Sequence, residues 1–123
     1  MLEYIDLNSD VDLSSGICVI MFYHFDCPNC RVALPIYNEM NEMLMGNQDE
    51  IKFAFIEMPP YGGEEDENPV PQNTQCITGK LREDKKFYAA SPLLIITHDS
   101  IVTKIFEVEV PLELDELLDA AVQ

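Results

Sequence analysis

Hydrophobic residues form short runs along the chain, separated by polar stretches, and these runs predict the order of the strands. Ile17 to Phe25 is a nearly continuous run of β-branched and aromatic residues, as in a central strand that is covered on both faces. Ile51 to Met58 has the same character. Shorter runs predict three further strands, at Leu2 to Leu7, Leu93 to Thr97 and Ile101 to Val108.

Other segments have apolar residues at three- and four-residue spacings, which is the pattern of a helix with one buried face. Arg31 to Met45 shows this spacing, and Gly46-Asn47 would end the helix. Pro35 lies inside this segment and removes a backbone hydrogen bond, so we expect a kink there. Two more helices are predicted, over Thr78 to Ala89 and Leu112 to Val122.

Pro59 to Gln75 interrupts this regular pattern with four prolines, two glycines and four consecutive acids, so we expect a long surface loop. The predicted order is then strand, strand, helix, strand, loop, helix, strand, strand, helix. This order indicates an α/β fold with a central mixed β-sheet flanked by helices on both faces. At 123 residues we expect a single domain, residues 1–123, with a loop insertion at about 59–75.

The charge of the chain narrows the classes of partner. With 23 acidic and 7 basic residues the formal net charge is −16, which repels phosphate backbones and argues against nucleic acid. No apolar run approaches the roughly 20 residues of a membrane span, and the first residues lack the pattern of a secretory signal. We expect no membrane insertion and a cytoplasmic location as written, or an extracytoplasmic one if the chain is an excised domain. The oligomeric state stays open.

Two of the four cysteines, Cys27 and Cys30, stand three residues apart between a predicted strand and a predicted helix. A Cys-x-x-Cys at the first turn of a helix places both sulfur atoms on one face, close enough for a reversible disulfide. The helix N-terminus would lower the pKa of the Cys27 thiol, so Cys27 is the predicted nucleophile and Cys30 the resolving thiol. Pro28 suits the first helical position because it has no N–H. The motif predicts thiol–disulfide exchange with a protein partner and needs no cofactor.

Two neighbours of the pair would shift the pKa of Cys27 in opposite directions. Asp26 places a negative charge beside the thiolate and would raise this pKa, whereas a protonated His24 would lower it. His24 is also a candidate for proton transfer, with a structural histidine as the alternative. These effects cannot be summed from the sequence, so the direction of the exchange, reduction or oxidation of the partner, stays open.

Zinc binding and an inert pair are the alternatives to redox chemistry. A closed zinc site needs four ligands, and no second pair with ligand spacing exists, so we expect no metal. The remaining cysteines and histidines are Cys18, Cys76, His24 and His98. Cys18 is expected to be a buried core residue. Cys76 is either a second reactive thiol in front of a predicted helix or an unremarkable loop or core thiol.

The stretch FDCPNCRVALP, Phe25 to Pro35, resembles the active-site helix of the thioredoxin superfamily, with a proline five residues after the second cysteine. Ser91-Pro92, directly before the strand from Leu93, resembles the family's cis-proline, which faces the cysteine pair and helps to hold the substrate backbone. The resemblance implies a thioredoxin-like fold, a role in cell redox homeostasis and catalysis by Cys27 and Cys30. The substrate-binding residues that it implies are Ser91, Pro92, Asp26, Pro28 and Asn29.

Three positions depart from the family pattern. Asp26 replaces the tryptophan that precedes the first cysteine, and Met21 stands where thioredoxin carries a buried acid. The thioredoxin route of proton transfer to Cys30 is therefore not predicted. Ser91 replaces the valine or threonine that glutaredoxins and periplasmic thiol oxidants commonly carry before the proline.

A second hypothesis comes from another class of protein. In it the chain is a redox-inactive thioredoxin-like module, and the acidic loop Glu64 to Glu67, with the adjacent Tyr61, binds a basic protein. The two hypotheses differ in the effect of Cys27→Ser, which would abolish turnover in an oxidoreductase and leave a binding module unchanged.

Overall fold

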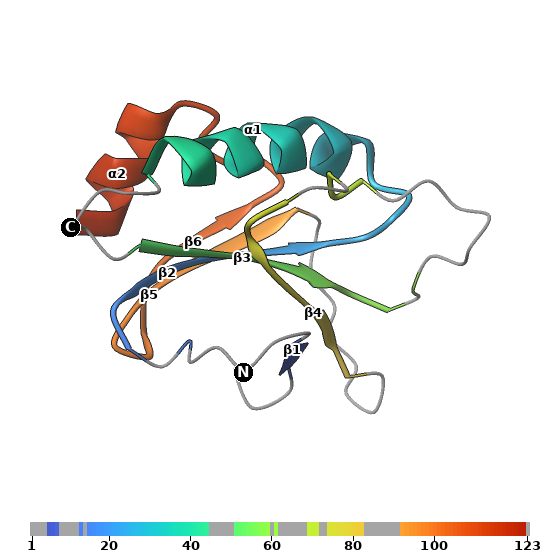
Figure 1. Ribbon diagram of the computed structural model, residues 1–123, viewed down its shortest axis with the longest axis horizontal. Coiled ribbons are helices and arrows are strands. Elements are labelled where there is room, and N and C mark those ends of the chain that lie inside the picture. Colours follow the sequence, from blue (N-terminus) through green and yellow to red (C-terminus); the bar gives the residue numbers. More distant parts are fainter. Residues whose placement is uncertain are drawn as a thin grey trace.

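The computed structural model describes residues 5–7, 13, 15–44, 51–59, 61, 69–71, 74–82 and 92–122. Within these residues the chain forms a β-sheet and two helices (Figure 1). The elements in chain order are β1 (Ile5–Leu7), β2 (Ile17–Tyr23), α1 (Pro28–Leu44), β3 (Ile51–Glu57), β4 (Ile77–Leu81), β5 (Leu93–His98), β6 (Ile101–Glu107) and α2 (Leu114–Val122).

The sheet is mixed, and its strand order is β1-β4-β3-β2-β5-β6. β2 pairs parallel with β3, and β3 with β4, whereas β1, β5 and β6 pair antiparallel with their neighbours. β2 is buried at every residue but its first, and β3 at its four central residues, in line with their apolar runs. Because β2, β3 and β4 are parallel, their carboxyl ends meet at one edge of the sheet, and the Cys-x-x-Cys follows β2 at that edge.

The core has two layers, one on each face of the sheet, because successive residues of a strand point to opposite faces. Val19 and Met21 of β2 lie in the layer under the helices, together with buried residues of α1 and Leu117 of α2. Cys18 and Ile20 face the other layer, which contains Leu13 and Met58. Figure 1 shows both helices above the same face of the sheet. The predicted α/β fold with a central mixed sheet is confirmed; helices were expected on both faces, and the two described helices lie on the same face.

The helix expected over Thr78 to Ala89 is wrong at its beginning, because β4 occupies Ile77–Leu81. Gly79 shows why this segment is a strand. A Cβ added at Gly79 would lie 2.6 Å from the backbone oxygen of Asp6, so only glycine lets β1 approach this closely. Glycine also disfavours the helix interior. Residues 83–90, the rest of the predicted helix, lie outside the described residues.

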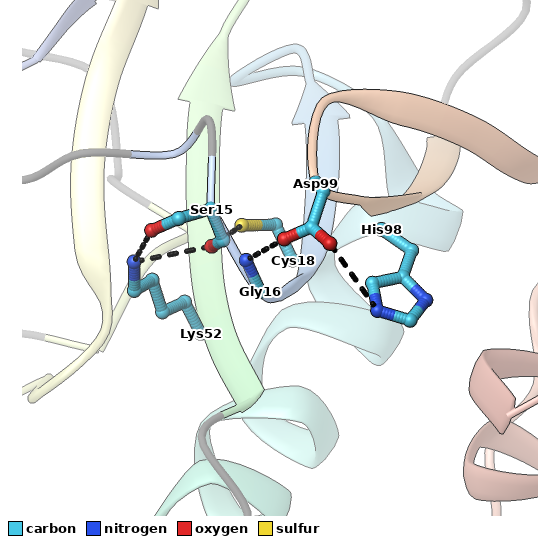
Figure 2. A network of polar contacts seen from close by, with 6 residues as sticks. All are labelled: Ser15, Gly16, Cys18, Lys52, His98 and Asp99. Carbon is cyan, nitrogen blue, oxygen red and sulfur yellow. Dashed lines mark hydrogen bonds and ion pairs between the residues drawn. The ribbon is translucent and has the colours of Figure 1, made fainter.

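A polar network fixes the sheet at the end remote from the cysteine pair (Figure 2). Asp99 lies in the tight turn between β5 and β6, where it and Ser100 have positive φ angles of 50° and 73°. Its carboxylate accepts a hydrogen bond from Gly16 N–H at 2.8 Å, and its own N–H donates to Gly16 O at 3.0 Å. Lys52 Nζ donates to Ser15 O at 3.3 Å. The start of β2 is thereby joined to β3 and to the β5–β6 turn.

Tyr37 connects α1 to the segment that leads into α2. Its hydroxyl donates to Pro111 O at 2.6 Å, and its ring meets Phe53 of β3 edge-on at 6.3 Å between centroids. Burial, together with the negative charge of Glu116, raises the pKa of the Tyr37 phenol, so this donor keeps its proton. Neither described helix is long and apolar enough to cross a membrane.

Candidate redox site

The two cysteines lie at the junction of β2 and α1. β2 ends at Tyr23, and Cys27 N–H donates to His24 O at 3.3 Å, which closes a tight turn between them. Pro28 is the first residue of α1, where its missing N–H costs no helical hydrogen bond. The helix therefore begins three residues before Arg31, where the apolar periodicity placed its start, and it includes Cys30.

Cys27 and Cys30 form a disulfide, with their Cα atoms 5.2 Å apart. The two residues differ in accessibility, because Cys27 is 8% exposed and Cys30 is fully buried at 0%. An attacking sulfur can therefore reach Cys27 more readily than Cys30. This asymmetry fits the predicted division into an accessible thiol and a resolving thiol.

Backbone groups of α1 point toward Cys27. The N–H of Cys30 donates to Cys27 Sγ at 3.1 Å, and the N–H of Arg31 donates to Cys27 O at 3.2 Å. The Arg31 bond is the first i→i−4 hydrogen bond of α1, whereas the N–H of Cys30 belongs to the first turn, where the helix has no internal acceptor for it. Once the disulfide is reduced, the same donor and the positive end of the helix dipole favour a thiolate on Cys27.

A side chain that the sequence did not single out also binds this turn. Arg31 Nη2 donates to Phe25 O at 2.9 Å, and the arginine is half-buried. It therefore spans the turn from the α1 side and contacts the residue two positions before Cys27. The spacing of residues 25 and 31 gives no pattern that predicts this contact, because the contact depends on the shape of the turn.

The structure places most of the predicted substrate-binding residues near the pair. Asp26, Pro28 and Asn29 are exposed beside the disulfide, and His24 is half-buried in the turn. Ser91 lies outside the described residues, and a cis bond before Pro92 stays a prediction.

Pro92 itself is buried, and its carbonyl accepts a hydrogen bond from Val108 N–H at 2.8 Å. Leu93 pairs with Phe22, so Pro92 lies at the same edge of the sheet as the cysteine pair. That Pro92 faces the cysteine pair stays a prediction.

Tyr23 and Glu57 form a cross-strand pair at this edge, at the carboxyl ends of β2 and β3. Burial of the phenol and the nearby charge of Glu57 raise the pKa of Tyr23, so it stays protonated over the physiological range. Glu57 was not predicted as part of the site, since only the register of β2 against β3 brings it there. Met21, at the position of thioredoxin's buried acid, is fully buried among apolar residues.

The two remaining cysteines are buried. Cys18 donates its thiol proton to Leu13 O at 3.3 Å, and the predicted core role is confirmed. Cys76 N–H donates to Thr74 Oγ1 at 3.1 Å, and its thiol donates to Asn38 Oδ1 of α1 at 3.9 Å. The pKa of Cys76 is raised to about 11, mainly by burial and also by the charge of Glu42, with the hydrogen bond to Thr74 acting in the opposite direction. Cys76 therefore fits the ordinary buried thiol better than the reactive one.

Tyr61, which the binding-module hypothesis uses, packs against β4. Its hydroxyl donates to Leu81 O, and Lys80 Nζ lies 4.8 Å from the centroid of its ring. The acidic stretch from Glu64 to Glu67 lies outside the described residues. Within the described ranges, no group of three or more histidine, cysteine or acidic side chains is placed to hold a metal ion.

Several solved structures have folds similar to that of this chain. The thioredoxin domain of a thiol-disulfide oxidoreductase from Bacteroides vulgatus has a TM-score of 0.63 at 13% identity, covering 97% of this chain and 94% of that one. Thioredoxin from Wuchereria bancrofti has a TM-score of 0.58 at 18% identity, covering 96% and 92%. A secreted disulfide oxidoreductase from Mycobacterium tuberculosis has a TM-score of 0.59 at 12% identity, covering 87% and 81%.

No family model matches the sequence, and no curated protein is significantly similar to it. Identities below 20% in these three comparisons support a common fold and leave activity to be argued from the site. Sheet order, position of α1 and position of the disulfide lead to one conclusion: this chain has the thioredoxin-like fold, with an oxidised Cys-x-x-Cys at the N-terminus of its first described helix.

Proposed function

We propose that this protein is a thiol–disulfide oxidoreductase that exchanges disulfides with a protein partner through Cys27 and Cys30. One observation carries the proposal: a disulfide joins an accessible cysteine at a helix N-terminus to a buried one in the first turn, and a backbone N–H is aimed at the accessible sulfur. This arrangement supplies both a target for nucleophilic attack and a stabilised leaving thiolate.

From the oxidised state, exchange begins with a thiolate of a partner dithiol. It attacks Cys27 Sγ, the Cys27–Cys30 bond breaks, and Cys30 leaves as a thiolate that takes up a proton. The second partner thiolate then attacks the partner sulfur of the mixed disulfide and releases the Cys27 thiolate. Two electrons pass from the partner dithiol to the cysteine pair, and the partner gains a disulfide. The reverse sequence reduces a partner disulfide.

The surrounding residues have proposed roles that follow their positions. Asp26, Pro28 and Asn29 would contact the partner around the exposed side of the disulfide, and Ser91-Pro92 would hold its backbone at the neighbouring edge of the sheet. His24 would transfer protons in the turn. One of the similar structures is of a secreted protein, so an extracytoplasmic site of action agrees with the fold as well as a cytoplasmic one does.

The test is a redox titration with thiol trapping. The protein is equilibrated in buffers of graded potential, unfolded in the presence of an alkylating reagent, and weighed by mass spectrometry. We expect two trapped cysteines in the oxidised state and four in the reduced state, with the change confined to Cys27 and Cys30. A midpoint near roughly −270 mV would indicate a reductant, and one nearer roughly −120 mV an oxidant.

Cys27→Ser and Cys30→Ser are the matched variants, and both should remove the transition. Four trapped thiols at every potential in the unaltered protein would contradict the oxidoreductase proposal and favour the binding module. Turnover of a model protein disulfide by the Cys27→Ser variant at the unaltered rate would contradict it as well.

A further inference from the structure

Arg31 is bound to the turn that carries Cys27 at two points. Its guanidinium donates to Phe25 O at 2.9 Å, and its backbone N–H makes the first i→i−4 hydrogen bond of α1, to Cys27 O at 3.2 Å. The guanidinium thus connects the first turn of α1 to the segment that directly follows β2. A planar, multi-donor group suits this task, because it holds a carbonyl in a fixed direction.

The charge of Arg31 also lies in an acidic environment. Between the end of β2 and the end of α1, Arg31 is the sole Lys or Arg, in a chain of net charge −16. Among the described residues, the other titratable groups that the fold brings to this edge of the sheet include Tyr23, His24, Asp26, Glu57, Tyr61, Lys80, Arg82, Asp6 and Glu107. Of these, Lys80 lies over the ring of Tyr61, and Asp26 carries a negative charge directly beside Cys27.

We propose that Arg31 is a positioning residue for Cys27: it fixes the turn that presents the Cys27 sulfur, and its guanidinium places a positive charge on that turn, so that the reduced cysteine is held as a thiolate. This inference rests on the proposed exchange activity. A stabilised thiolate favours the reduced form, so Arg31 makes the pair more oxidising than the same turn without the guanidinium.

The experiment follows the alkylation of Cys27 by iodoacetamide in the fully reduced, folded protein as a function of pH, with the modified peptide identified by mass. Arg31→Met removes both charge and donors, and Arg31→Lys keeps the charge but loses the planar fork. We expect Arg31→Met to shift the profile to higher pH and to lower the rate at pH 7 by about threefold to tenfold. Arg31→Lys should restore at least half of this rate.

Lys52→Met is the matched control, because it removes one positive charge at the opposite end of the sheet and should leave the profile unchanged. The redox midpoint gives a second measurement, and it should move to a more negative potential in Arg31→Met. If Arg31→Met does not fold, Arg31→Gln keeps an N–H donor for Phe25 O while removing the charge, and its profile should also move to higher pH.

An unaltered pH profile in a folded Arg31→Met or Arg31→Gln protein, or an equal shift in Lys52→Met, would overturn this role for Arg31. If the proposed function itself is wrong, the redox titration of the unaltered protein will show no two-electron transition. A normal transition with no effect of Arg31 would therefore reject the inference and leave the oxidoreductase intact.

Discussion

Cys27 and Cys76 have neighbours that act in opposite directions on the ionisation of their thiols. Cys27 has a helix N-terminus and the N–H of Cys30 beside its sulfur. Cys76 is buried against Asn38, and burial raises its pKa to about 11. Of these two thiols, Cys27 therefore has the surroundings that favour a thiolate, and Cys76 has those that favour the protonated thiol.

The buried Cys76 predicts a pH-dependent stability. An unfolded cysteine titrates near 9.0 and the folded Cys76 near about 11, so between these values the folded state holds a proton that the unfolded state has lost. A raised folded pKa gives a contribution that is complete below about pH 9 and is lost as the pH rises through about 11. The free energy of unfolding should therefore fall over this window by about 2 kcal/mol more in the unaltered protein than in Cys76→Ala.

Urea denaturation of both proteins at several pH values between about 8 and 11 measures this difference. Tyrosines with raised pKa values, Tyr23 and Tyr37, are present in both proteins and cancel in the comparison. Parallel stability curves would show that Cys76 titrates like an ordinary thiol in the folded protein.

Removing the charge of Asp26 should shift the pH profile of Cys27 alkylation in the opposite direction to removing the charge of Arg31. Asp26→Asn removes a negative charge beside Cys27 without changing the size of an exposed side chain. The pH profile of Cys27 alkylation should shift to lower pH, and the redox midpoint should become less negative. Asp119→Asn, an equal charge change at an exposed position of α2, is the control and should do neither. A shift of the same size in both variants would assign the effect to net charge instead.

The sequence predicted the residues of the site that form a motif and missed those that depend on the shape of the fold. Cys27, Cys30 and Pro28 follow from spacing and helix chemistry, and Cys18 from its position in an apolar run. Arg31 is absent from the prediction because its acceptor, Phe25 O, is a backbone atom placed by the turn. Glu57 is absent because a neighbour on another strand is known only once the register is known.

Among the elements, the pairing of β1 with β4 depends on one residue. Gly79→Ala would place a Cβ against the backbone oxygen of Asp6, 2.6 Å away, and neither backbone can move without losing the pairing. We expect a loss of about 2 kcal/mol in the free energy of unfolding, measured by chemical denaturation. Thr78→Ala, at the adjacent and half-buried position of the same strand, is the control.

The redox midpoint of Gly79→Ala should stay unchanged, because β1 and β4 lie at the side of the sheet away from β2. A stability equal to that of Thr78→Ala would show that β1 does not pair as described. A changed midpoint would show instead that the pairing of β1 with β4 affects the redox potential of the cysteine pair.

Strong periodicity made α1, α2, β2, β3, β5 and β6 predictable to within a few residues. β4 was missed because Ile77–Leu81 is short and contains a glycine, and because basic residues after it continue a helix-like pattern. Its pairing partners, β3 and β1, supply the stabilisation that its own sequence does not signal. Tertiary pairing therefore decided this element against local preference.

The whole molecule carries a formal charge of −16, and this field acts on any partner before contact. Charged groups at the surface attract or repel over a Debye length, which is roughly 30 Å at 0.01 M salt and roughly 3 Å at 1 M. A cationic protein segment should therefore meet the disulfide of this protein faster than an anionic one of equal thiol chemistry. The net charge of the chain would then make cationic partners react faster than anionic ones that have the same thiol chemistry.

Two peptides with the same pair of cysteines, one flanked by lysines and one by glutamates, test this selection. With the oxidised protein, we expect the cationic dithiol to be oxidised at least about tenfold faster at 0.01 M salt, and the ratio to approach one as the salt concentration rises toward about 1 M. A small uncharged dithiol is the control, because its rate should hardly depend on salt. Equal rates for the two peptides at low salt would contradict electrostatic selection, whereas a ratio that persists at high salt would assign the preference to direct contacts around Asp26, Pro28 and Asn29.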